Sequence, residues 1–303
     1  MPVLTEDNSG TLGETSEYDL KIEDFSGTFE QKKAAVAKFN LMDDLFFSVV
    51  MEDKAACEYL LGRLMGMNVN VIENKTQYSL RNLEGHSAVL DLLVKDDSGK
   101  IYNVEVQGID EHDHEYRMRY YISLMDHSFL KKGGQYKDLP ETYMIFISKF
   151  DPFKLNKIHY EIKQIIDGTN EQFSDGVHRH YFNTAVNDET PLSELMQYLV
   201  KSDPNDNRFG GLSNAVRYHK VSEKGVDSMC EPIRVMFEEG MIQAETRGRA
   251  EGKAEGKAEG KAEGMILMIN NLLARGNSLE DALLIAEIDE QTYNKYKEIN
   301  GSC

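Results

Sequence analysis

Two acids and an amide near the middle of the chain have the residue types and spacing of a catalytic site. Asp91 stands in the apolar run Val89–Val94, and Glu105 and Gln107 stand in the apolar run Ile101–Gln107. Residues two apart on a strand point to one face, so Glu105 and Gln107 share a face. If a hairpin joins the two runs with its loop centred near residues 97–98, Asp91 lies opposite Glu105.

Two neighbouring carboxylates repel each other by several kcal/mol where the effective dielectric is about 20. Such a pair shares a proton, is solvated, or binds a cation. A hard divalent ion such as Mg²⁺ suits oxygen ligands and keeps several waters, one of which can attack a phosphodiester. The alternative for Asp91 and Glu105 is a solvated sheet edge with ordinary surface acids.

The elements that position these residues follow from hydrophobic periodicity and turn signals. Asp43 and Asp44 can cap a first helix, and Gly66 ends a second. The order of helices and strands predicts an α/β fold with one mixed central sheet flanked by helices. The expected elements are helices from Asp43, over Ala55–Met65 and over Asp113–Leu130, and strands over Val89–Val94, Ile101–Gln107 and Thr142–Ser148.

The composition restricts the class of protein. The chain has 303 residues and a net charge of −18, which excludes a protein that coats DNA through bulk positive charge. Three scattered cysteines argue against a disulfide framework and fit a reducing cytoplasm. The start of the chain lacks the pattern of a signal peptide, and no apolar run is long enough for a membrane helix.

Several ordered motifs carry a resemblance to a known family. The segment from Thr76 to Gln107 resembles the recombination-promoting nucleases, also described as PD-(D/E)XK nuclease family transposases. The resemblance covers roughly residues 38–236. The flanking motifs that agree are Leu41–Phe47, Arg117–Tyr121, Leu130–Gly133, Tyr136–Glu141 and Tyr143–Ile147.

The resemblance implies a restriction-endonuclease-like core and Mg²⁺-dependent DNA cleavage, with Mn²⁺ as an alternative ion. Asp91 and Glu105 match the two metal-binding acids of the motif, and Asp44 matches an acid of the first helix, as a further ligand or metal-positioning group. Gln107 replaces the usual lysine; it can orient water or a phosphate oxygen by hydrogen bonding but cannot act as a base. The alternative for Asp44 is a helix cap.

Candidate DNA contacts follow the predicted catalytic strands. Arg117 and Tyr121 are four residues apart on a predicted helix and therefore point the same way. Arg117 could hold a phosphate with two hydrogen bonds, or form a salt bridge within its acid-rich helix. Lys131 and Lys132 could follow the DNA backbone, or be solvated surface lysines.

We expect five segments along the chain. The repeat Arg249–Gly264 places Lys and Glu two apart and a glycine in every fourth position, so alone it is a marginal helix or a flexible linker. In an assembly the same repeat would form a helix that joins copies into a homo-oligomer. The segments are a flexible arm (1–37), the nuclease-like core (38–153), a mainly helical accessory extension (154–240), the repeat segment (241–264) and a small helical end (265–303).

The leading hypothesis is a cytoplasmic, Mg²⁺-dependent DNA endonuclease in which Asp91 and Glu105 hold the metal, Gln107 orients water or phosphate and Asp44 assists. A second hypothesis is a catalytically weak or inactive nuclease fold that binds DNA or protein. A third is a structural protein organised by the repeat. The acidic composition and the glutamine at position 107 favour the second over an active enzyme.

Overall fold

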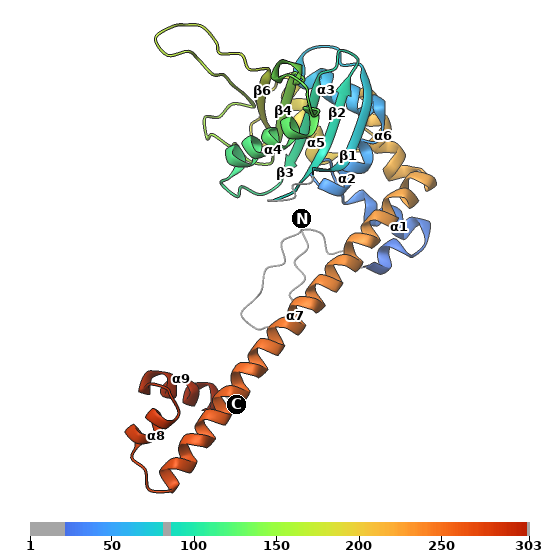
Figure 1. Cartoon of the computed structure of the whole chain (residues 1–303). Helices are drawn as coiled ribbons and strands as arrows, with labels where there is room; N and C mark the ends of the chain where they lie inside the picture. Colours follow the sequence, from blue (N-terminus) through green and yellow to red (C-terminus); the bar gives the residue numbers. More distant parts are fainter. Residues whose placement is uncertain (1–21, 81–85, 302–303) are drawn as a thin grey trace. The chain divides into compact units, whose positions relative to one another are not determined.

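The computed structural model describes residues 22–80 and 86–301. The chain divides into two compact units between Arg234 and Val235, and each unit is described by itself. The first unit holds a sheet with helices around it, and the second is helical (Figure 1). No helix in the described ranges combines the length and apolar character that a membrane crossing requires.

Six strands form one mixed sheet in the order β1-β2-β3-β4-β6-β5. The pairs β1–β2, β2–β3 and β5–β6 are antiparallel, and the pairs β3–β4 and β4–β6 are parallel. A mixed sheet with flanking helices confirms the predicted fold class. The strands are β1 (Val71–Leu80), β2 (Ala88–Asp96), β3 (Ile101–Gln107), β4 (Thr142–Ser148), β5 (His159–Ile162) and β6 (Val177–Asn183).

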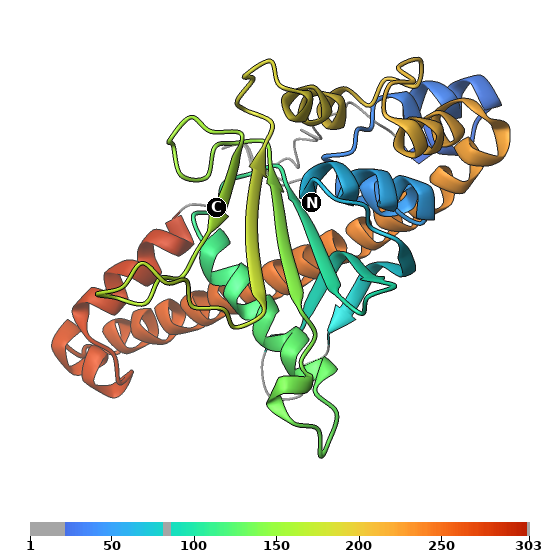
Figure 2. The same ribbon diagram turned by 90° about the horizontal axis from the view of Figure 1, so that it is seen from above.

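The helices of the first unit cover both faces of the sheet. Helix α4 packs on one face through Met118, Ile122 and Met125, and α2 lies over β1, β2 and β3 on the other (Figure 2). The first-unit helices are α1 (Phe29–Ala37), α2 (Asp44–Val50), α3 (Lys54–Met65), α4 (His114–Phe129), α5 (Pro191–Lys201) and α6 (Gly210–Val221), with 3₁₀ turns η1 (Ile22–Phe25) and η2 (Tyr136–Asp138).

The β2–β3 hairpin has the predicted register. Asp96 accepts hydrogen bonds at 2.9 Å from the backbone amides of Ser98 and Lys100, which closes the loop tightly. The tight loop fixes the strands so that Leu92 lies opposite Val104, as the placement of the loop near residues 97–98 predicted. Alternation along β3 then sends the side chain of Glu105 to the opposite face from Val104.

Two sequence-based expectations were wrong. Residues 154–240 are mainly helical, as predicted, but the expected end of the core at residue 153 was wrong, because β5 and β6 from this segment belong to the same sheet as β4. The arm expected over residues 1–37 includes α1, which begins with a capping box between Thr28 and Gln31. The rest of the expected arm, residues 1–21, lies outside the described residues.

The second unit contains the glycine repeat as a continuous helix. Helix α7 (Glu223–Ala274) begins in the first unit, and it is followed by α8 (Leu279–Ile285) and α9 (Glu290–Gly301). Gly276, in the left-handed region at φ +91, follows the end of α7, and Ser278 caps α8. Ile269 packs against Ala282 and Tyr293 in a small apolar core. The repeat therefore forms a helix in this structure, and the linker alternative is not adopted.

Candidate active site

Asp91 and Glu105 lie where the β2–β3 ladder opens. Regular pairing of the two strands ends at Leu92 and Val104. Beyond that point the Val106 amide donates a hydrogen bond of 2.9 Å to Asp91 Oδ2, and the Asp91 amide donates one of 3.4 Å to Glu105 Oε1. Each carboxylate thus accepts from the backbone of the opposite strand, and the exchange holds the two acids side by side.

The Glu105 carboxylate is buried in a polar setting. Its side chain is 8% exposed, and Asn103, on the same face of β3, donates from Nδ2 to Glu105 Oε1 at 2.8 Å. Among described atoms, Asn103 Oδ1 is buried without a hydrogen-bond partner. Buried polar atoms normally find partners, so an unpartnered oxygen beside a carboxylate is a feature of binding sites.

Burial and mutual repulsion keep both acids from ionising easily. Burial, together with the charge of Asp91, raises the pKa of Glu105 well above its ordinary value. Burial, together with the charge of Asp44, raises the pKa of Asp91 to about 7. Hydrogen bonds from the Val106 amide and from Gln77 act against the rise at Asp91. A cation bound beside the two acids would oppose both pKa shifts, because it favours the charged form of each carboxyl group.

Asp44 is the first residue of α2, and Asp43 occupies the capping position before it. The cap alternative for Asp44 is therefore not adopted. Its charge acts on Asp91, and a carboxylate in the first turn of a helix is favoured by the helix dipole. The structure thus brings Asp44 into the electrostatic environment of Asp91.

Gln107 and Arg117 contact each other. Arg117 Nη1 donates to Gln107 Oε1 at 2.8 Å, and the same guanidinium pairs with Glu111 and Asp113. The salt-bridge alternative for Arg117 is therefore present in the structure. Arg117 thus orients the Gln107 side chain, whose amide NH₂ can donate to a water or a phosphate oxygen.

The remaining predicted residues differ in their relation to the acids. Tyr121 is half-buried on α4, and its pKa is raised to about 12 by burial and by the charge of Glu105, so it lies in the electrostatic environment of that acid. Lys131 and Lys132 are exposed beyond the end of α4. The helix rises about 18 Å over the 12 residues from Arg117 to its last residue, Phe129, and Lys131 follows two residues later.

Sequence reasoning missed one contributor to the site. Gln77 lies between the register pairs Thr76–Leu92 and Tyr78–Leu90, and therefore opposite Asp91. Its side chain forms a hydrogen bond with Asp91, and its backbone has the left-handed φ of +49. The residue type gives no sign of this conformation, because a left-handed backbone is usual for glycine or asparagine and not for glutamine.

The donor set fits a magnesium-type ion. Across the described ranges, no three His, Cys, Asp or Glu side chains converge as a metal-binding group. Mg²⁺ in phosphate-processing sites is commonly held by one or two carboxylates, with water and substrate oxygens as further ligands. The pair Asp91 and Glu105 meets this requirement, whereas Asp44 completes no three-acid cluster.

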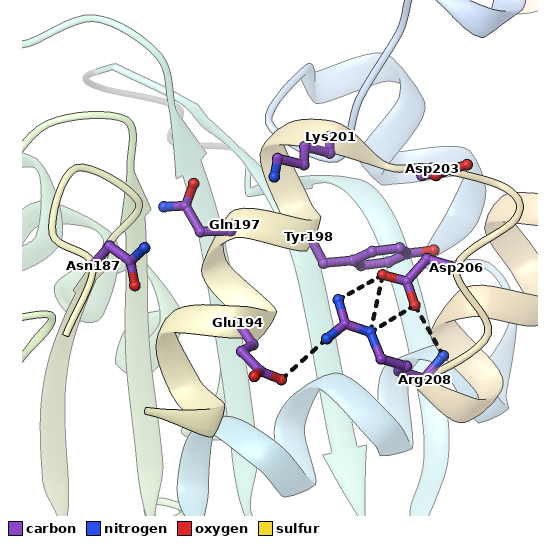
Figure 3. A pocket seen from close by; sticks show the side chains of 8 residues that line it. All are labelled: Asn187, Glu194, Gln197, Tyr198, Lys201, Asp203, Asp206 and Arg208. Atoms are coloured by element: carbon purple, nitrogen blue, oxygen red, sulfur yellow. Dashed lines mark hydrogen bonds and ion pairs between the residues drawn. The ribbon is translucent and has the colours of Figure 1, made fainter. Parts of the chain in front are cut away.

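A pocket of about 340 Å³ lies apart from the acid pair, beside α5 (Figure 3). Its arginine, Arg208, is held by Asp206 and Glu194, so that the charges in the pocket largely neutralise one another. None of the predicted site residues lines this pocket. The lining residues are Asn187, Glu194, Gln197, Tyr198, Lys201, Asp203, Asp206 and Arg208.

A mixed sheet that carries a buried acid pair and an amide on adjoining strands defines a nuclease fold of the PD-(D/E)XK type. The model of one family, described as PD-(D/E)XK nuclease family transposase, matches residues 47–200, and the chain belongs to this family. The matched segment contains all six strands together with Asp91, Glu105 and Gln107, and Asp44 lies just before it. No curated protein and no solved structure matches the chain significantly.

Proposed function

We propose that the protein is a Mg²⁺-dependent DNA endonuclease of the recombination-promoting type that acts in the cytoplasm. The observation that carries the proposal is the pair Asp91 and Glu105, which lies at an opening in the ladder, where each carboxylate accepts a hydrogen bond from the backbone of the opposite strand and where burial and the charge of Asp91 raise the pKa of Glu105. In a family of nuclease fold, such a pair is suited to a divalent ion.

The proposed roles follow from the contacts of each side chain. Asp91 and Glu105 would hold the metal, which when bound polarises a phosphate oxygen and makes water a better nucleophile. Gln107, which Arg117 orients, donates from its amide to the attacking water or a non-bridging oxygen. Asp44 adds negative charge beside Asp91, and Tyr121 closes the site on the α4 side.

Arg117 is a positioning residue in this scheme. Its guanidinium already contacts Gln107, Glu111 and Asp113. A direct contact with a phosphate would therefore require Arg117 to exchange one of these partners. We therefore assign Arg117 the role of holding the Gln107 side chain in one rotamer. An amide donor that is already held in place stabilises the transition state more than one that must first be ordered.

Nicking of supercoiled plasmid in the presence of Mg²⁺ or Mn²⁺ tests the proposal. We expect the unchanged chain to nick the plasmid and the Asp91→Ala and Glu105→Ala chains to lose that activity. Nicking that survives both substitutions would indicate a contaminating nuclease and would refute the assignment.

A second candidate function is a catalytically weak module that binds DNA or protein. The specific observation in its favour is Gln107 itself, which cannot act as a base at the position where the wider fold family has lysine and whose carbonyl oxygen accepts a hydrogen bond from Arg117. Calorimetry separates the two candidates. The absence of Mg²⁺ or Mn²⁺ binding at millimolar metal would favour the binding module.

We further propose that α7 joins copies of the chain. At 100° per residue, the glycines from Gly248 to Gly264 fall within an arc of about 160°. Ile242 and Leu267 project into the same arc and are 62% and 64% exposed. Each glycine of the arc has no described atom within 4 Å of an added Cβ. The same arc also carries charged side chains of the repeat, so the glycines permit close approach of a second helix while charges of both signs can pair across the contact.

Truncation of the chain at Thr246 tests the assembly. Light scattering should give a smaller assembly for the truncated chain than for the full chain. An unchanged number of copies per particle would exclude the repeat helix as the interface.

A further inference from the structure

The exposed side of α4 and the loop after it carry a local excess of positive charge. Residues 116–137 contain five Lys and Arg residues and one acid, in a chain whose net charge is −18. We call the exposed basic and aromatic residues of this segment that follow the end of α4 the α4 ridge. The ridge consists of Lys131, Lys132, Tyr136 and Lys137, all of which are exposed.

The charges of the α4 ridge are not neutralised by the protein. Among the described residues, no acid pairs with Lys131, Lys132 or Lys137. Arg117 on α4 has two acidic partners. The ridge therefore keeps its positive potential for an external anion.

The loop presents its side chains in a defined geometry. Gly133 has a left-handed φ of +85, and the Gly134 amide donates to the Lys131 carbonyl at 2.8 Å. A 3₁₀ turn follows, closed by a hydrogen bond of 2.8 Å from the Gln135 amide to Asp138 Oδ2. Tyr136 opens this turn and is 86% exposed. The two hydrogen bonds fix the backbone before Tyr136 and in its turn, and the exposed Tyr136 side chain stands between Lys132 and Lys137 in the sequence.

The length of α4 separates the ridge from the site. Helix α4 begins beside the site, where Arg117 contacts Gln107, and ends at Phe129, two residues before Lys131. The helix rises about 18 Å from Arg117 to Phe129, so a span that continues to Lys131 corresponds to about six base pairs of duplex at 3.4 Å per step. Figure 2 shows α4 along the sheet and the loop after it extending beyond the sheet.

We propose that the α4 ridge holds the phosphate backbone of duplex DNA about six base pairs from the phosphate at the acid pair. The lysines pair with phosphates, and the Tyr136 hydroxyl donates to a phosphate oxygen of the same backbone. The inference rests on the proposed nuclease function and adds to it the length of duplex that the protein grips. It predicts that a duplex too short to reach the ridge binds more weakly.

Fluorescence anisotropy with labelled duplexes tests the ridge, with Ca²⁺ in place of Mg²⁺ to suppress hydrolysis. The test variant is Lys131→Ala/Lys132→Ala/Lys137→Ala in the full chain. The matched control, called the distal-lysine control, removes the same charge from three exposed lysines outside α4 and α7. The control variant is Lys157→Ala/Lys163→Ala/Lys295→Ala.

For a 24-base-pair duplex we expect the ridge variant to bind at least about tenfold more weakly than the unchanged chain. The slope of log affinity against log salt should fall by about 2.7, since each phosphate contact contributes about 0.9. The distal-lysine control should keep both values. With an 8-base-pair duplex centred on the site, the unchanged chain and the ridge variant should bind alike. Tyr136→Phe should weaken binding of the long duplex alone.

Three results would overturn the inference, and they are distinguishable. If the unchanged chain binds the long duplex and the ridge variant matches it in affinity and salt slope, the ridge is not the contact. An equal loss in the distal-lysine control would also exclude the ridge, because the effect would then be one of net charge. If the unchanged chain binds no duplex even at low salt, the proposed nuclease function fails together with the ridge.

Discussion

Metal affinity should depend on pH through Asp91. Burial and the charge of Asp44 raise the pKa of Asp91 to about 7, so its proton competes with the cation near neutral pH. For one competing proton, lowering the pH from 8 to 6 reduces the unprotonated fraction from about 90% to about 10%. The apparent affinity for Mn²⁺ should then fall by about tenfold, or about 1.4 kcal/mol. Protonation of Glu105, whose pKa is also raised, acts in the same direction.

Calorimetric titration of the metal-free protein with Mn²⁺ at pH 6 and pH 8 measures this change. Repeating each titration in two buffers of different ionisation enthalpy gives the number of protons released. We expect at least about one proton per ion at pH 6 and fewer at pH 8. In the Asp44→Asn chain the pKa of Asp91 should be lower, and the ratio between the two affinities should shrink.

Equal affinity at the two pH values, with no proton released at pH 6, would refute the reasoning. Such a result would mean that the pair is already ionised in the metal-free protein, or that Mn²⁺ binds elsewhere. A pH dependence that persists unchanged in Asp91→Asn would also assign it to another group.

Three further predictions concern stability and positioning. In the metal-free protein the free energy of unfolding should fall as pH rises from about 4 to about 7, because the folded state retains the Asp91 proton after the unfolded chain has lost it. Thermal melts of the unchanged and Asp91→Asn chains check this, and a parallel decline in both would contradict it. Arg117→Ala should lower kcat more than it raises KM by freeing Gln107, and Arg117→Lys should restore part of kcat; a change in KM alone would argue against positioning. Gly211→Ala should cost about 1–3 kcal/mol in urea unfolding, because its Cβ would lie 2.4 Å from the Ala55 carbonyl oxygen; an unchanged midpoint would show that α3 and α6 yield there.

The catalytic hairpin could be predicted because its signals are local. Apolar runs bounded by a turn-rich segment gave the strand Ile101–Gln107, and placing the loop gave the pairing of Leu92 with Val104. Strand β6 could not be predicted in the same way. Its first half reads His178, Arg179 and His180 and is only half-buried, so it lacks the apolar pattern of an interior strand.

The contacts within the site were less predictable than the acids themselves. Residue type and spacing brought Asp91 and Glu105 together, but the capture of Gln107 by Arg117 depends on side-chain rotamers. The contribution of Gln77 depends on a left-handed backbone inside β1. Helix α1 is a different case, because its capping box is a local signal that the sequence does contain.

The most direct test of the central claim is the initial rate of plasmid nicking by the unchanged chain and by the isosteric variants Asp91→Asn and Glu105→Gln, each with Mg²⁺ and with chelator. The account predicts Mg²⁺-dependent nicking that falls by about 1,000-fold in either variant, as expected when several kcal/mol of metal-assisted stabilisation is lost. Circular dichroism should show that both variants remain folded. Nicking at the unchanged rate in a folded variant, or nicking that persists in chelator, would contradict the account.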